Sequence, residues 1–175
     1  MTYTSTLNIS EQLDAVVNVV KQTVGSKLSQ VQSTTSGQTI PAVIKKRITD
    51  KTSTNQPAVN LPYPYCTVDF IRADLWGGCE QLNFKVLPNG NHIYETDYIV
   101  KIAVDFVGRA TDDPHTIAAN MHRALTTSYY RDILSGLCKG QLYRLSNDIK
   151  RGAIQRQTEW VDMSTIILDI AFRDV

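Results

Sequence analysis

The chain has 175 residues, of which 42% are hydrophobic and 20% are charged. This length supports one domain with a real core and is too short for two domains of ordinary size. Because 18 basic residues stand against 17 acidic ones, the net charge of +1 provides no overall field that would draw the chain onto nucleic acid or an anionic membrane. We therefore expect any partner to be selected by local shape.

The sequence shows neither a membrane span nor a secretion signal. No apolar run approaches the roughly 18 residues that a membrane helix needs. The N-terminal stretch MTYTSTLNIS lacks the basic start and the apolar core of a signal peptide, so we expect the chain to stay in a cytosol. Three widely separated cysteines without a CxxC pair predict free and mostly buried thiols. They are Cys66, Cys79 and Cys138.

An amphipathic helix is predicted over residues 8–28, where apolar residues recur at three- and four-residue steps. Asn8, followed three residues later by Glu11, fits a capping box that would satisfy backbone amides of the first turn. Because the apolar residues form one stripe, we expect this helix to pack on a single surface.

Residues 29–60 form a long polar connection rich in Ser, Thr, Gln, Asn and Pro. Such a length is unusual inside a compact domain, where most connections run about 4 to 6 residues. We expect this segment to be either mobile or ordered by a partner. It is locally basic, although a solvated loop is the simpler explanation for that cluster. The basic residues are Lys45, Lys46, Arg47 and Lys51.

Residues 61–175 carry the pattern of a sheet combined with helices. The stretch YCTVDFIR reads as a half-buried strand because apolar and polar residues alternate in it. Its inward residues are Cys66, Val68 and Phe70. The turn signals GG and PNGN follow, and they predict two hairpins or one long excursion over residues 73–95.

The next strand, residues 98–107, has one apolar face and one mixed face, as expected of a central strand with partial cover on its second side. GRATDDP separates it from a helix. Asp112 and Asp113 stand where a cap accepts hydrogen bonds from first-turn amides, and Pro114 suits the first helical position. A phosphate-binding turn would need more glycine and would not carry two negative charges.

No catalytic or metal-binding arrangement is visible. Adjacent Asp112 and Asp113 would point apart instead of converging on one substrate. His115 and His122 are separated by two helical turns, about 10 Å, whereas a zinc pair on a helix is spaced by one turn. Ser135 in ILSGL lacks the first glycine of a GxSxG elbow. We predict no catalytic residue, no metal site, no cofactor and therefore no enzyme.

Two helices and a closing strand complete the predicted fold. The first helix would bury Ile117, Ala118, Met121, Ala124 and Leu125. The second would bury Tyr130, Ile133, Leu134 and Leu137. In the last strand the inward residues would be Ser164, Ile166, Leu168, Ile170 and Phe172, and such a terminal strand would add to a sheet edge or close the sheet. The prediction is a single α+β domain with a mostly antiparallel, mixed sheet and helices packed mainly on one face.

The order of these signals resembles the neck or tail terminator family of tailed bacteriophages. The stretches that carry the resemblance are LPYPYCTVDFIR, a variable loop, YETDYIVKIAVDFVGRATDDPHTIAANMHRAL, YRDILSGL and RQTEWVDMSTIILDIAFR. Together they cover residues 61–173.

This resemblance implies a structural protein that assembles as a homohexameric ring on the head-proximal end of a completed tail tube. Its partners would be further copies of itself, the tail tube protein, with the sheath as a further candidate, and the head-completion proteins of the neck. Genome DNA would only pass through the lumen, and no membrane would be involved. The protein would be assembled in the host cytoplasm and reside in the virion.

Eight residues are candidates for contacts between subunits or with partners. They are Lys45, Lys46, Arg47, Trp76, Asn89, Asn91, Arg144 and Arg151. Three other functions remain open. A tail-completion or tail-tube-like protein would form stacks, and a small enzyme is disfavoured by the missing site. A nucleic-acid-binding module finds its best support in the basic stretch RLSNDIKRGAIQRQ, which lacks an aromatic stacking platform.

Overall fold

The computed structural model describes residues 8–33, 36–45, 61–75, 83–86, 88, 92–156 and 159–174. The helices within these ranges are α1 (Ile9–Val24), η1 (Gly25–Lys27), η3 (Ala110–Asp112), α2 (Pro114–Leu125) and α3 (Ser128–Cys138). The strands are β1 (Gln30–Gln32), β2 (Thr39–Pro41), β3 (Val43–Lys45), β4 (Tyr65–Leu75), β5 (Asn83–Val86), β6 (His92–Gly108), β7 (Gln141–Leu145), β8 (Lys150–Arg156) and β9 (Glu159–Asp174).

Apart from the β1–β2 hairpin, the described strands form one mixed sheet with the order β3-β4-β6-β9-β7. β3 runs parallel to β4, and the other neighbours are antiparallel. β5 pairs with β6, and β8 pairs with β9. Residues 162–165 of β9 pair with β6 and β8 at once, so β8 shares the outer edge of β9 with β7. β9 is therefore an interior strand, where an edge or closing strand was predicted.

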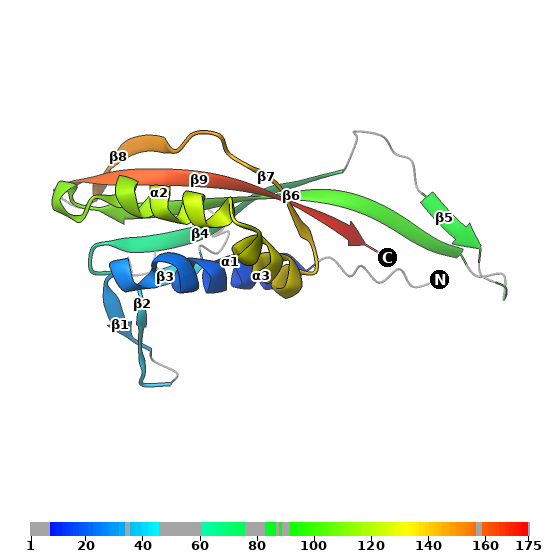
Figure 1. Ribbon diagram of the computed structural model, residues 1–175, viewed down its shortest axis with the longest axis horizontal. Helices are drawn as coiled ribbons and strands as arrows, with labels where there is room; N and C mark the ends of the chain where they lie inside the picture. Colours follow the sequence, from blue (N-terminus) through cyan, green and yellow to red (C-terminus); the bar gives the residue numbers. More distant parts are fainter. Residues whose placement is uncertain are drawn as a thin grey trace, which may run out of the picture.

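All three α-helices lie on one face of the sheet, as predicted (Figure 1). Alternation places every second side chain of the long strands against these helices. Phe106 of β6 and Leu168 of β9 are both completely buried. Burying an apolar side chain of this size contributes about 1.5–3 kcal/mol to folding. The inward residues predicted for β4, β6 and β9 form most of the strand part of this core.

Helix α1 begins where the capping signal predicts. The Asn8 side chain accepts hydrogen bonds from the backbone amides of Ser10 (3.1 Å) and Glu11 (3.3 Å). Its buried face packs against the other two helices and against β3 and β4. The helix gives way to a 3-10 turn at Gly25, where the predicted helix would have continued to residue 28.

Three further parts of the fold differ from the sequence prediction. The connection after residue 28 contains three short strands, of which β1 and β2 pair with each other and β3 pairs with the start of β4. In α3, Leu137 is 44% exposed, and Cys138 occupies the buried position one turn after Leu134. β6 begins at His92 instead of residue 98, and its first part pairs with β5 beyond the end of the helical layer (Figure 1).

Candidate functional site

Asp113 caps α2, as predicted, whereas Asp112 belongs to the capping box of the preceding 3-10 turn η3 instead of capping α2. Asp112 accepts a hydrogen bond from the backbone amide of Arg109 at 2.7 Å, and Asp113 accepts one from the amide of Thr116 at 3.1 Å. Hydrogen bonds from the side chain and the backbone amide of Thr116 lower the pKa of the Asp113 carboxyl. Asp113 also adopts a left-handed backbone conformation with φ of 46°. Aspartate and asparagine tolerate that conformation better than other non-glycine residues do.

Replacing Asp113 by alanine is expected to lower the melting temperature by a few degrees, because it removes the cap and leaves a Cβ in left-handed backbone. Asparagine should preserve stability at neutral pH. The cap of the wild-type protein is fully formed above the pKa of an unfolded aspartate and weakens as the pH falls through the lowered pKa of Asp113. Calorimetry at several pH values measures both effects. A melting temperature of the asparagine variant that fell as far as that of the alanine variant would contradict the capping role.

The described cysteines are buried and free, as predicted, while Cys79 lies outside the described residues. Burial raises the pKa of the Cys66 thiol, and the Asp105 carboxylate adds to this effect. Burial also raises the pKa of the Cys138 thiol. Both groups therefore hold little of the thiolate form that reacts with alkylating agents or metals.

Iodoacetamide should label Cys66 and Cys138 of the folded protein roughly 100-fold or more slowly than a free thiol, because labelling requires local opening. In denaturant both should react fully. Mass spectrometry of peptides after timed labelling measures each site separately. Rapid labelling of Cys66 in the native state would show that this part of the core opens easily.

Neither the histidines nor any acidic group of the described chain forms a metal site. Within the described ranges, no three His, Cys, Asp or Glu side chains lie close enough to hold an ion. His122 on α2 instead makes a 2.7 Å hydrogen bond with the backbone carbonyl of Ser146, which ties the helix to the loop after β7. No helix in the same ranges is long and apolar enough to cross a membrane. Two surfaces of the described chain have features that suggest contacts with other molecules.

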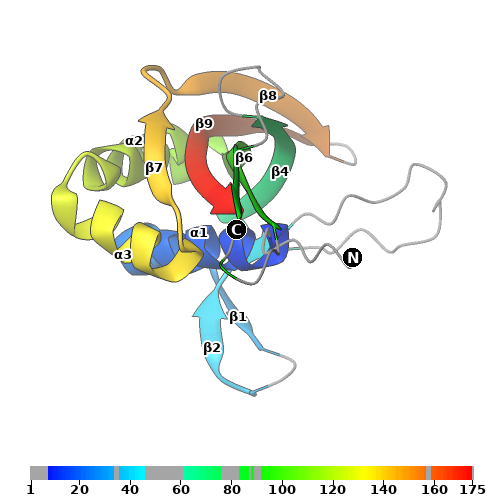
Figure 2. The same ribbon diagram turned by 90° about the vertical axis from the view of Figure 1, so that its right-hand side faces the viewer.

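The first such surface is the β1–β2 hairpin, residues 30–41, which we call the arm. It projects from the body on the helical side of the sheet in both views (Figures 1 and 2). Its two strands pair only with each other among the described residues. The sequence QVQSTTSGQTIP contains no charged residue, so the arm offers hydrogen-bonding groups without charge. A two-stranded ribbon of this length is marginally stable by itself.

The base of the arm is fixed firmly to the body. The amide of Ser29 donates to the carbonyl of Pro64, and the amide of Ala42 donates to the carbonyl of Ser29, each at 2.8 Å. At Gly25, an added Cβ would lie 2.9 Å from Cγ of Pro41, so only glycine permits this close contact. The arm is thus held in a defined direction while its tip extends away from the core.

The second surface is the face of the sheet opposite the helices. Hydrogen bonds join three strands here, because Thr67 of β4 (3.4 Å) and Thr165 of β9 (2.6 Å) both donate to the Asp105 carboxylate of β6. A second row follows along the strands. The Asp169 carboxylate accepts a hydrogen bond from Nε of Arg144 at 3.1 Å and lies 3.8 Å from Nζ of Lys101.

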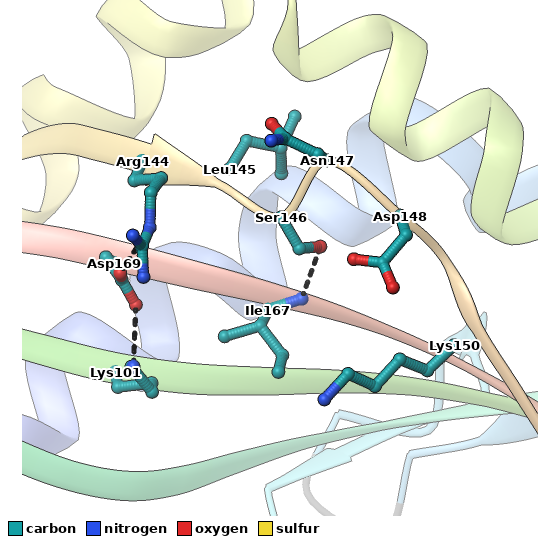
Figure 3. A pocket seen from close by; sticks show the side chains of 9 residues that line it. All are labelled: Lys101, Arg144, Leu145, Ser146, Asn147, Asp148, Lys150, Ile167 and Asp169. Carbon is teal, nitrogen blue, oxygen red and sulfur yellow. Dashed lines mark hydrogen bonds and ion pairs between the residues drawn. The ribbon is translucent and has the colours of Figure 1, made fainter.

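A pocket of about 350 Å³ opens beside this second row (Figure 3). Arg144, Asp169 and Lys101 form one side, and Asp148 and Lys150 lie across Ile167 from them (Figure 3). The loop after β7 is held in place at Ser146, whose amide donates to the carbonyl of Ile167 at 2.9 Å and whose hydroxyl accepts from the amide of Ile167 at 3.1 Å.

The three candidate interface residues that the structure describes lie at three different places. Lys45 forms a 2.8 Å ion pair with Asp14 and so connects β3 to α1. Arg144 lines the pocket just described, whereas Arg151 lines a separate hollow near the start of α2. The others lie outside the described residues. They are Lys46, Arg47, Trp76, Asn89 and Asn91.

The sequence did not predict that Lys101, Asp169 and Lys150 belong to one site. Lys150 was visible only as part of the basic stretch RLSNDIKRGAIQRQ, and Lys101 and Asp169 only as charged residues on the mixed faces of the two long strands. Lys101 and Asp169 lie directly opposite each other in the β6–β9 register, which a single sequence does not reveal.

The family model described as phage neck terminator protein matches residues 27–175. The match includes the arm, the sheet, α2 and α3, and it leaves out residues 1–26, which contain α1 and the start of the turn after it. No curated protein matches the chain.

Proposed function

The chain belongs to the phage neck terminator family, and from this premise we propose that it forms a closed ring of identical subunits that caps the head-proximal end of the tail tube. Membership of this structural family, over residues 27–175, is the observation that carries the proposal. A terminator has to stop a growing tube, and a closed ring does so because it leaves no free end for addition of another tube subunit.

The arm supports ring formation. Ring contacts between identical subunits are heterologous, so each subunit needs one surface that reaches out and a different surface that receives it. The arm projects, is anchored rigidly at its base and carries no charge that would repel a second copy. We assign it to the contact with the adjacent subunit.

The two ends of the ring would serve different partners. One end would bind the tail tube, with the sheath as a further candidate, and the other would bind head-completion proteins of the neck. We expect a homohexamer, with genome DNA passing through the lumen without a dedicated binding site. Assembly would take place in the host cytoplasm before the subunits become part of the virion.

Sedimentation velocity combined with negative-stain imaging of the purified full chain tests this proposal. A single closed ring of uniform size is the expected result. Open stacks of variable length would indicate a tube-like protein instead. A monomer at all accessible concentrations, in the presence and absence of tail tubes, would contradict ring formation.

A further inference from the structure

The pocket beside Asp169 has a positive charge that the described residues leave unbalanced. Three cationic side chains and two carboxylates line it. Asp169 is only 5% exposed, and its charge is balanced by Arg144 and Lys101. Lys150 has no ion-pair partner among the described residues, and Figure 3 shows its ammonium group beneath Ile167. An incoming negative group would therefore find Lys150 and the outer nitrogens of Arg144 available.

One acceptor in the pocket has no hydrogen bond. The Oδ1 atom of Asp169 is buried and accepts no hydrogen bond from any described group, although Nζ of Lys101 lies 3.8 Å from it. A buried carboxylate oxygen without a donor is costly, which indicates that the site is completed by something else. The missing partner must supply an acceptor for Lys150 and a donor for Asp169.

We propose that this pocket is a socket for an acidic side chain from a second copy of the chain, an inference that rests on the proposed ring. A protein segment carries both required groups, since its carboxylate accepts from Lys150 and its backbone N–H donates to Asp169. The backbone of duplex DNA offers acceptors only.

The chain provides suitable acids on other surfaces. Glu11 of α1, Asp132 of α3 and Asp162 of β9 are exposed and lack a cationic partner within the described part of the chain. Glu11 and Asp132 lie in the helical layer, on the side of the sheet opposite the socket. A contact between the socket of one copy and the helical layer of the next is heterologous, as a ring requires.

Reversing the charge of Lys150 tests the socket. The Lys150 side chain is exposed and forms no ion pair with any described residue, so Lys150→Glu should leave the melting temperature within about 2 °C of wild type. The same change should raise the subunit concentration at which half of the subunits are assembled by at least about tenfold, because the introduced glutamate would then face the acidic side chain of the second copy. Lys150→Arg should assemble normally. Arg151, itself a candidate interface residue, lies outside the socket, and an equal loss of assembly in Arg151→Glu would show that the effect is not specific to the socket.

Charge exchange identifies the occupant. In the Lys150→Glu background, changing Glu11, Asp132 or Asp162 to lysine should restore assembly at one of the three positions and fail at the other two. Restoration at none of them would overturn a second copy as the occupant. If the Lys150→Glu variant still forms intact rings but no longer binds duplex DNA as wild type does, the inference would be overturned in favour of phosphate as the occupant.

The failure of the socket and the failure of the ring can be told apart. If Lys150→Glu forms rings as well as wild type does, the socket inference is wrong, whereas the proposed ring is retained. If wild type forms no ring, the proposed function fails and the socket fails with it.

Discussion

Replacing Phe106 by alanine is expected to lower the free energy of unfolding by about 3–5 kcal/mol, and Leu168→Ala by about 2–5 kcal/mol. Both side chains are completely buried between the sheet and the helices, so each change removes buried apolar contacts and leaves a cavity. Denaturant unfolding followed by circular dichroism measures the loss. These would be among the largest effects of any single substitution in the chain.

Ile71→Ala is the control for this pair. Ile71 belongs to β4 but is 45% exposed, so its truncation should change the free energy of unfolding by only about 0.5 kcal/mol. Equal losses at Ile71 and Phe106 would mean that the helix-facing side of the sheet is not the main source of stability.

Removing the arm is expected to abolish ring assembly while leaving the subunit folded. Gln30 and Pro41 are directly paired, so residues 31–40 can be replaced by an Asn-Gly turn that closes a tight hairpin between them. Of the deleted residues, Val31 packs against a small core cluster, and its loss should cost about 1 kcal/mol. Sedimentation velocity should then show a single folded subunit at concentrations where wild type forms rings.

A milder variant tests whether the tip of the arm is needed in addition to its paired strands. Replacing residues 33–38 by Asn-Gly keeps the paired strands and removes only the tip, and it should produce weakened rings. Normal rings from the variant that lacks residues 31–40 would show that the subunit contact lies elsewhere.

Alternation alone predicts much of the core. In β6 and β9 every second residue is apolar over a long stretch, and the side chains of Ile102, Phe106 and Leu168 are buried as this pattern indicates. The caps at Asn8 and Asp113 are equally predictable, because they depend on contacts within one turn of the chain.

Strand order and the candidate surfaces could not be predicted in the same way. The position of β9 between β6 and the β7–β8 edge depends on register between segments that are far apart in the chain. The socket has the same origin, since Lys101, Lys150 and Asp169 come from three different strands. The arm was predicted only as polar connection, because three-residue strands of Gln, Thr and Val carry no recognisable alternation.

The interior position of β9 has a consequence for synthesis. β9 follows β6, β7 and β8 in the chain, and it is the strand that joins β7 and β8 to the rest of the described sheet. A ribosome therefore releases these partners before it delivers the segment that connects them. Pairing between such distant segments is slow, and open strand edges are prone to wrong associations. In the nascent subunit, β7 and β8 therefore stay unpaired with the rest of the sheet until β9 emerges. The socket also forms only at that point, because Asp169 belongs to β9.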